Sequence, residues 1–220
     1  RTLPPLAEAT VSQDKFRRSI NDYQTLCGEV EARGGTLQSL SAGWEIGPCP
    51  GLTIRCLGPS QTRAVELAAL FADLNREEER ETFRQKLSAL DGAMNNYSAI
   101  LLLDYRGTRI LLPGDTNRLG YGEIAPEDLP AHLFKVGHHG QRDGADAALI
   151  RAVRPKAVIC CASSDRRYQS AHPELLRLLA DNGAALYFSD CPQLPHLAPP
   201  PHQALVFTIG AEGHFTAEYQ

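Results

Sequence analysis

The chain has 220 residues, a mass of 24.0 kDa and a hydrophobic fraction of 43%, values typical of one globular domain with a real core. Its net charge of −4 and its pI of about 6.0 disfavour a surface that coats nucleic acid generally, while a local basic groove stays compatible with them. The longest purely apolar run, Ala99–Leu103, is too short for a membrane span or a signal peptide.

The cysteines and the first residue bear on where the protein acts. No two of the six cysteines have the CxxC spacing of a cysteine zinc site, and Cys160-Cys161 lies in an apolar run, where small buried thiols are common. The cytoplasm is therefore the expected compartment, with an extracytoplasmic location as the alternative. The chain starts at Arg1 rather than at Met, as expected of a piece of a longer protein.

The first expected element is an amphipathic helix from Ser12 to Arg33. Ser12 is its expected N-cap, and Gly34-Gly35 ends it. Its apolar residues, spaced by three and four positions, are Phe16, Ile20, Tyr23, Leu26, Cys27 and Val30.

Two short strands are expected next. Thr36–Glu45 is the first, with Trp44 near its end, and Leu52–Leu57 is the second, closed by Gly58-Pro59. The Gly- and Pro-rich segment Gly47–Gly51 between them is typical of a turn.

Two helical segments, each with an apolar stripe, are expected from Arg63 to Leu90. The charged run Arg76–Glu81 between them indicates a solvated face or a helix junction.

A β-hairpin follows, with strands Ser98–Asp104 and Thr108–Leu112 joined across Arg106-Gly107. Its first strand is apolar throughout, as in a strand covered on both faces. Strands and helices then alternate, which implies right-handed crossovers onto a largely parallel sheet. These elements are a strand at Leu133, a helix Ala145–Val153, a strand Ala157–Ala162, a helix Pro173–Asp181 and a strand Ala185–Ser189, then the proline-rich loop Pro192–Pro201 and two antiparallel strands, Ala204–Ile209 and Phe215–Tyr219.

Polar groups follow the ends of consecutive core strands. Asp115 ends the run Arg109–Asp115, His138-His139 end the run Leu133–Gly140, and His172 precedes Pro173 at a helix start. Neighbouring parallel strands would open these loops on one edge of the sheet, where α/β proteins place their chemistry. A carboxylate with imidazoles is a donor set for zinc or manganese, so the sequence indicates a metal site.

Other interpretations of these residues stay open. A His-His pair alone is typical of a surface loop or of partly buried imidazoles with satisfied hydrogen bonds. His196, His202 and His214 are best explained as ordinary loop and turn residues. Asn95-Asn96 either shapes the mouth of the cleft or serves turn chemistry. The donors found here also do not complete a site for two ions, which needs about six to eight.

With these residues identified, the chain resembles the second half of a metallo-β-lactamase-fold domain, in the ComEC-type branch of competence-related proteins and their stand-alone relatives. The resemblance covers about residues 95–190 and, more loosely, Leu52–Pro59. Outside that branch it is rare to find Gly-Asp, here Gly114-Asp115, followed about 20 residues later by Lys-Val-Gly-His-His-Gly, here Lys135–Gly140. The segments that carry the resemblance are Asn95-Asn96-x-Ser98, the apolar hairpin that follows it, Gly114-Asp115, Lys135–Gly140, Pro155–Ile159, Ala171–Pro173 and Tyr187–Asp190.

The resemblance implies an α/β fold, the second half of an αββα sandwich with a mixed sheet flanked by helices. By this resemblance Asp115 bridges two divalent ions, zinc or manganese, while one of His138 and His139 is a ligand and the other faces substrate or supports the site. His172 is then a ligand of the second ion or a phosphate contact. The predicted metal ligands are thus Asp115, His138, His139 and His172, and the first three are also the predicted catalytic residues.

The chain also departs from that family. The H-x-H-x-D-H motif of the first half of the fold is absent, and the helix at Ser12 resembles the one after that motif, so the motif is expected just upstream of Arg1. Gln141 stands where a serine is usual, and Ala171 replaces a glycine. Residues 63–91 are longer than the equivalent loop and are interpreted as a helical insertion or lid within a single domain, residues 1–220.

The expected function is metal-dependent hydrolysis of a phosphodiester, with nucleic acid such as DNA as the candidate substrate and a metal-bound hydroxide as the nucleophile. One alternative, favoured by the absent motif, is a catalytically inactive half-domain that serves as a binding or partner module. Another is a hydrolase of a different ester, such as a phosphorylcholine ester or a lactone, favoured by the acidic pI and the lack of a basic cluster near the site. The sequence does not define the oligomeric state.

Overall fold

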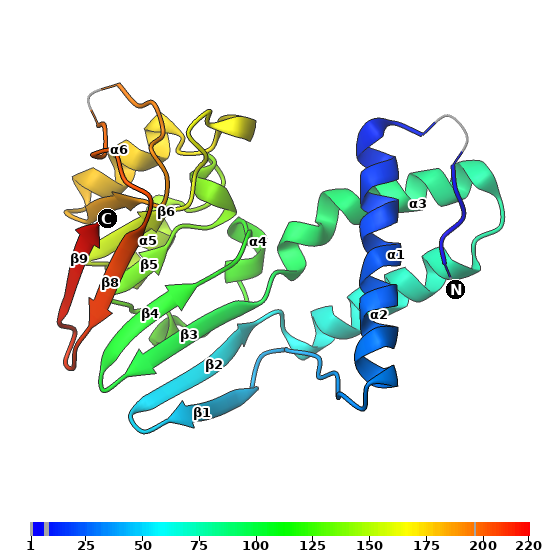
Figure 1. Cartoon of the computed structure of the whole chain (residues 1–220), viewed down its shortest axis with the longest axis horizontal. Coiled ribbons are helices and arrows are strands. Elements are labelled where there is room, and N and C mark those ends of the chain that lie inside the picture. The colour runs from blue at the N-terminus through cyan, green and yellow to red at the C-terminus, as the bar shows by residue number, and fades with distance from the viewer. Residues whose placement is uncertain (1, 7–8, 196) are drawn as a thin grey trace. The chain divides into compact units, whose positions relative to one another are not determined.

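The computed structural model describes residues 2–6, 9–195 and 197–220, so His196 of the proline-rich loop lies outside the described residues. The chain divides into two compact units (Figure 1). The helical unit combines Arg1–Leu40 with Gln61–Met94, and the sheet unit combines Ser41–Ser60 with Asn95–Gln220. The single domain expected over residues 1–220 stays a prediction.

Most elements form where the periodicity of the sequence predicts them. The helix Pro173–Asp181 has the predicted bounds, because Pro173 at N1 fixes where it starts. In chain order the elements are α1 (Val11–Ala32), β1 (Glu45–Cys49), β2 (Leu52–Gly58), α2 (Gln61–Arg76), α3 (Arg80–Ala93), β3 (Ile100–Tyr105), β4 (Thr108–Leu112), α4 (Arg118–Tyr121), β5 (Leu133–Lys135), α5 (Ala147–Val153), β6 (Ala157–Cys160), α6 (Pro173–Asp181), β7 (Ala185–Phe188), β8 (Leu205–Ile209) and β9 (Phe215–Tyr219).

The strand predicted at Thr36–Glu45 is wrong, because no strand forms between Thr36 and Trp44. The turn predicted at Gly47–Gly51 is correct only at Pro50-Gly51, since β1 takes up Gly47, Pro48 and Cys49. Antiparallel pairing with β2 places Glu45 opposite Arg55 and Cys49 opposite Leu52, with a bulge between them. Tertiary pairing therefore overrides the poor strand propensity of Gly and Pro.

The start of α1 also differs from the prediction, because its N-cap is Thr10 and not Ser12. The Thr10 hydroxyl accepts a hydrogen bond from the main-chain N–H of Gln13, and the Gln13 side chain accepts one from the main-chain N–H of Thr10. This reciprocal capping box satisfies two N–H groups that the first turn of the helix would leave unpaired.

The helical unit is held together by a small apolar cluster in which α1 packs on α3 (Figure 1). Gln13 Nε2 also donates a hydrogen bond of 2.7 Å to Ser88 Oγ of α3. Only part of the predicted apolar face of α1 is used, since Tyr23 is 67% and Leu26 is 62% exposed. The buried members of the cluster are Leu3, Ile20, Leu74, Phe83, Leu87 and Leu90.

The sheet unit is built on one sheet, which within the described residues has seven strands in the order β1-β2-β3-β4-β5-β6-β7. Strands β1 to β4 pair antiparallel and strands β4 to β7 pair parallel, so the sheet is mixed rather than largely parallel. A mixed sheet with helices packed against it is the α/β class that the sequence predicts.

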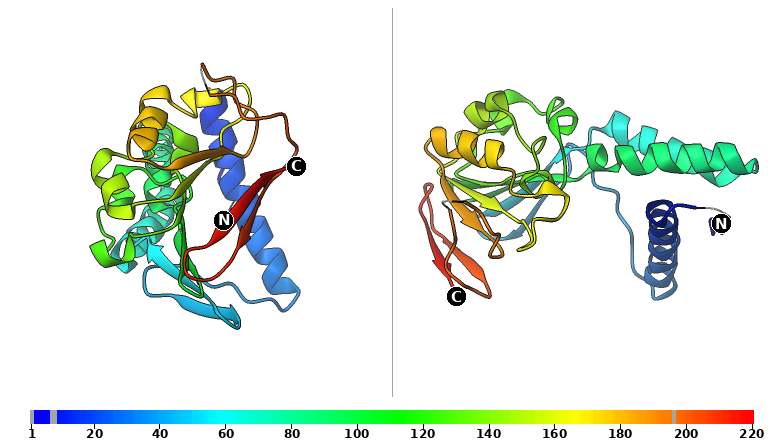
Figure 2. Two further views of the ribbon diagram at one scale, coloured as in Figure 1. Left: turned by 90° about the vertical axis from the view of Figure 1, so that its left-hand side faces the viewer. Right: turned by 90° about the horizontal axis from the view of Figure 1, so that it is seen from above.

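The two faces of the sheet are covered differently (Figure 2). Phe188 of β7 is buried in the core with Leu175 and Leu179 of α6. The neighbouring Tyr187 points to the opposite face, where its ring centroid lies 5.2 Å from that of Phe207 in β8. The antiparallel pair of β8 and β9, which the sequence predicts, thus covers the face opposite α6. No helix among the described residues has the length and apolarity needed to cross a membrane.

Candidate functional site

The candidate site lies at the edge of the sheet where β4, β5 and β6 end. These strands run parallel, with Leu111 opposite Phe134 and Lys135 opposite Ile159. Their carboxyl ends therefore open on the same edge of the sheet. Asp115 follows β4 and His138-His139 follow β5, so the strand order alone brings these loops together.

Asp115 and His139 are in direct contact: Asp115 Oδ2 and His139 Nε2 are 3.2 Å apart. The other ring nitrogen, Nδ1, lies 2.8 Å from the carbonyl oxygen of Cys161, which can only accept a hydrogen bond. Nδ1 therefore carries a proton, and in the neutral ring Nε2 turns a lone pair toward the carboxylate. Two acceptors at this distance repel each other, so the contact is favourable only with a proton shared between the two atoms or with a metal ion bound to both.

His138 makes different contacts from its neighbour. Its Nε2 lies 3.1 Å from Asn95 Nδ2, which donates, and its Nδ1 lies 3.0 Å from Asp143 Oδ1. Protein groups therefore engage both ring nitrogens of His138. The sequence left open which of the two histidines faces the carboxylate, and the structure places His139 there. Asn95, expected at the mouth of the cleft or in a turn, contacts a site histidine.

His172 is the N-cap residue of α6, as the sequence predicts. Its main-chain N–H donates to the carbonyl oxygen of Gly140 at 2.8 Å, and the N–H of Ala171 donates to that of His139 at 3.1 Å. These bonds tie the start of α6 to the histidine loop. Within the described part of the chain, His172 Nδ1 is buried and has no hydrogen-bond partner.

Lys135 adds a positive charge to the site and is not among the predicted site residues. Its Nζ donates to the carbonyl oxygen of Gly114 at 2.6 Å and lies 3.5 Å from Asp115 Oδ1, and its side chain is 16% exposed. The sequence could have indicated this contact. Lys135 lies at the end of β5 between the buried Phe134 and Val136, so its side chain points to the face of the sheet opposite theirs. Lys135 therefore holds the turn before Asp115 and partly balances the carboxylate charge.

The backbone of the site is strained. His138, His139 and Ala171 have φ angles of 46°, 54° and 49°, in the left-handed region that non-glycine residues seldom adopt. Each such residue costs about 1 kcal/mol or more, and conformations of this kind collect at functional sites. The strain at these positions is consistent with a functional role for the loop.

The described residues contain no group of three or more His, Cys, Asp or Glu side chains that could hold a metal ion. Asp115 and His139 are two donors in contact, whereas His138 is engaged by Asn95 and Asp143. The ligand set of Asp115, His138, His139 and His172, and the two zinc or manganese ions expected with it, therefore stay predictions.

All six cysteines are free thiols.

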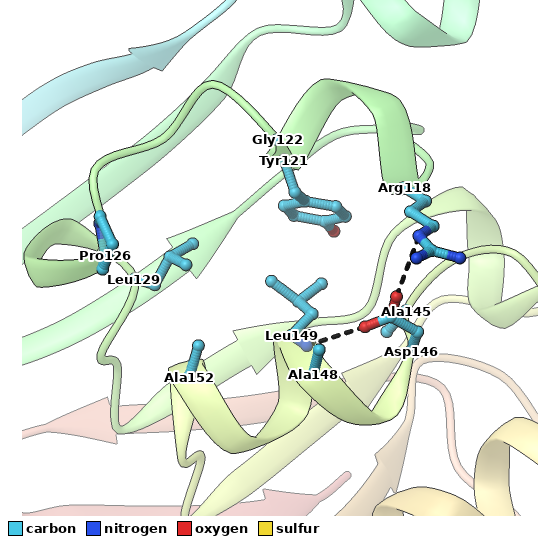
Figure 3. A pocket seen from close by; sticks show the side chains of 10 residues that line it. All are labelled: Arg118, Tyr121, Gly122, Pro126, Leu129, Ala145, Asp146, Ala148, Leu149 and Ala152. Atoms are coloured by element: carbon cyan, nitrogen blue, oxygen red, sulfur yellow. Dashed lines mark hydrogen bonds and ion pairs between the residues drawn. The ribbon is translucent and has the colours of Figure 1, made fainter.

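A cavity of about 350 Å³ lies between α4 and α5, and none of the predicted site residues lines it (Figure 3). Tyr121, Leu129 and Leu149 give it an apolar lining, and burial raises the pKa of the Tyr121 phenol. At its rim Arg118 Nε lies 3.2 Å from Asp146 Oδ2, and Asp146 Oδ1 accepts from the N–H of Leu149 to cap α5. The interaction of Arg118 with Asp146 is therefore explained by the role of Asp146 as the N-cap of α5.

Comparison with known proteins gives one partial similarity. No protein-family model matches the chain. A stretch of 87 residues, 39% of the chain, is 32% identical to ComE operon protein 3 of Bacillus subtilis (strain 168). The match spans 11% of the length of that relative. The chain is therefore similar to a small part of a competence-operon protein, in agreement with the competence-related resemblance of its motifs.

Proposed function

We propose that this chain is the C-terminal part of a metallo-β-lactamase-like domain that hydrolyses phosphodiesters with divalent metal ions. The observation that carries the proposal is the contact of Asp115 Oδ2 with His139 Nε2, at a ring whose Nδ1 is held by the Cys161 carbonyl. A main-chain carbonyl on the far nitrogen is the usual support of a metal-ligating imidazole. The similarity to ComE operon protein 3 and the α/β sheet agree with the proposal.

The donor chemistry of the site fits part of a metal centre. A divalent ion would satisfy the facing lone pairs of Asp115 and His139. His172 has a buried, unpartnered Nδ1 but does not join these two side chains in a three-donor group of the described residues. Two four-coordinate ions with open positions need roughly six protein donors, three for each ion. The remaining donors have to come from outside the described residues. Bound ions would supply an activated water and stabilise charge on phosphate oxygens.

The other residues of the site act by positioning. Lys135 donates a hydrogen bond to the Gly114 carbonyl and thereby fixes the main chain that leads into Asp115. His138 links Asn95 to Asp143 and fixes the loop that carries His139. We therefore assign His139 as the ligand of the histidine pair and His138 as its support.

Metal content and hydrolysis of bis(p-nitrophenyl) phosphate test this function on a chain extended upstream of Arg1. The extended protein is expected to hold about two zinc or manganese ions. Asp115→Asn is expected to reduce hydrolysis by more than about 100-fold, because even changes outside the ligand shell cost 10- to 100-fold. His139→Gln should lower the metal content, and His138→Gln should largely retain it.

The control variant is Asp181→Asn, an exposed carboxylate at the end of α6 that should keep both metal and activity. An extended protein that binds no metal by elemental analysis would show that the proposal is wrong.

A catalytically inactive binding module is the second candidate, favoured by the lack of a three-donor group in the described residues. An H-x-H-x-D-H motif in the upstream reading frame would argue for the enzyme, and a stop codon there for the module. Hydrolysis of another ester is a third candidate, consistent with the pI of about 6.0. Parallel assays with single-stranded DNA, a phosphorylcholine ester and a lactone separate it from the first.

A further inference from the structure

A second cavity, of about 280 Å³, opens directly at the candidate site. It is bounded by the end of β6 and by the loop that leads to α6. Its lining includes His139, Cys161, Ser163, Arg167, Tyr168 and Ser170. A molecule in this cavity would therefore lie against the imidazole that faces Asp115.

The loop is strained and held in place at the same time. Arg166, Tyr168 and Gln169 have φ angles of 49°, 56° and 59°, a cluster of non-glycine residues in the left-handed region. Arg166 fixes this conformation, since its Nε donates to the carbonyl oxygen of Ser170 and its Nη2 to that of Ala171, at 3.3 and 3.2 Å. The fold thus keeps an unfavourable backbone conformation over the cavity, which is typical of a binding site.

The strained loop presents an aromatic ring to solvent. Tyr168 is 83% exposed, more than any other large hydrophobic side chain among the described residues. A buried ring would contribute to the core, but this one adds nothing to stability where it lies. An exposed aromatic ring beside a phosphodiester site is a surface on which a nucleobase can stack.

Arg167 places a positive charge beside that ring. Its Nε contacts Asp165 Oδ2 at 2.6 Å, and its side chain is 76% exposed. Asp165 is itself fixed by a hydrogen bond from Ser163 Oγ at 2.7 Å. Because the contact to Asp165 uses Nε, the terminal nitrogens of the guanidinium fork remain for a phosphate oxygen.

We propose that Tyr168 and Arg167 form a subsite for one nucleotide of a single-stranded nucleic acid. The base stacks on Tyr168, the phosphate contacts Arg167, and the chain continues past His139. This subsite rests on the proposed function, which supplies the reacting phosphodiester. Single strands are favoured because a base is free to stack only when it is not paired in a duplex.

Binding measured without metal tests the subsite separately from catalysis. The probe is a fluorescein-labelled oligothymidylate of about eight nucleotides, a length within the site sizes of proteins that bind single-stranded nucleic acid. Its fluorescence anisotropy is followed with the 220-residue chain in EDTA. Tyr168→Ala should weaken binding about 10-fold or more, while Tyr168→Phe, which keeps the ring, should stay within about twofold of wild type. Arg167→Gln should weaken binding and lower the slope of log affinity against log salt by about 0.7.

The chain offers a matched pair of controls in Arg118 and Leu119. They are likewise an exposed arginine with a carboxylate partner followed by an exposed apolar side chain, and they lie outside the cavity. Arg118→Gln and Leu119→Ala should each bind the oligonucleotide as wild type does, within about twofold. An abasic oligonucleotide with the same phosphates should bind wild type and Tyr168→Ala equally weakly.

Two results would overturn the subsite. One is wild-type affinity in Tyr168→Ala, and the other is the absence of measurable oligonucleotide binding by wild type. Neither depends on metal content or on the Asp115→Asn assay. If the extended protein holds metal normally but Tyr168→Ala binds the oligonucleotide as wild type does, only the subsite is refuted. If the extended protein binds no metal by elemental analysis but Tyr168→Ala still weakens oligonucleotide binding, only the proposed hydrolysis is refuted.

Discussion

Gly137, which precedes the two site histidines, is expected to tolerate no side chain. A Cβ atom at this position would lie 2.4 Å from the carbonyl oxygen of Thr116, 2.8 Å from Tyr121 Oη and 2.9 Å from the carbonyl oxygen of Gly144. Its φ is −62°, an ordinary value for alanine, so the restriction is one of space and not of backbone conformation. Gly137→Ala therefore isolates the steric effect.

The size of the effect follows from those distances. Ordinary contacts of a Cβ begin near 3.4 Å, so the main chain at Thr116 or Gly137 would have to move by about 1 Å. Overpacking of a well-packed site costs typically 1–3 kcal/mol, and a Cβ that meets two main-chain carbonyls and a buried phenol at once places this variant at about 3 kcal/mol. The same displacement would shift His138 and His139, so oligonucleotide binding or hydrolysis should fall as well.

Urea unfolding followed by the fluorescence of Trp44 measures this change, because the only tryptophan of the chain lies in the sheet unit. Gly47→Ala in β1 is the control, since a Cβ there meets only the carbonyl oxygen of Leu52 at 3.7 Å. It should change the free energy of unfolding by no more than about 0.5 kcal/mol. A Gly137→Ala protein as stable as the Gly47→Ala protein would refute the steric reasoning.

Two further predictions follow from pKa shifts. Hydrogen bonds from the Thr82 side chain and from main-chain N–H groups at Glu81 and Thr82 lower the pKa of Glu79 to about 2 from an ordinary 4.5. The stability that this N-cap gives to α3 is therefore present above pH 4.5 and is lost as the pH falls toward 2, and Glu79→Gln should flatten that part of the pH dependence of helical circular dichroism. Burial raises the pKa of the Cys160 thiol to about 12, so iodoacetamide at pH 8 should label the exposed Cys49 and leave Cys160 unlabelled until urea unfolds the protein. Equal labelling of the two thiols by mass spectrometry would contradict this second expectation.

Much of the sheet unit could be predicted because its signals are local. The apolar runs that became β3 and β5 end at turn residues, and the rule for parallel strands placed Asp115 and His139 at one edge. The sequence did not predict that Glu45–Cys49 forms the strand β1, because this strand depends on pairing with β2 and not on its own composition.

The finer geometry of the site lies beyond sequence patterns for a similar reason. Which histidine meets Asp115 depends on left-handed backbone angles at two consecutive residues, and most histidines do not adopt such angles, so the sequence does not specify them. The contact of Asn95 with His138 joins residues separated by 43 positions, and the anchor of His139 is a main-chain carbonyl at Cys161. A carbonyl oxygen is present at every residue, so no pattern of side chains reveals this one.

The order of the strands also bears on how the protein is made. Each strand from β2 to β7 pairs with the strand that precedes it in the chain, so the sheet can be extended from one side as the ribosome releases it. The cluster of Ile20 with Leu74 and Leu87 instead joins two segments with the β1–β2 hairpin between them. Synthesis therefore delivers α2 and α3 before β3 can pair with β2. We expect the helical cluster to close first. By bringing together the ends of the segment between β2 and β3, it would shorten the search of β3 for its partner.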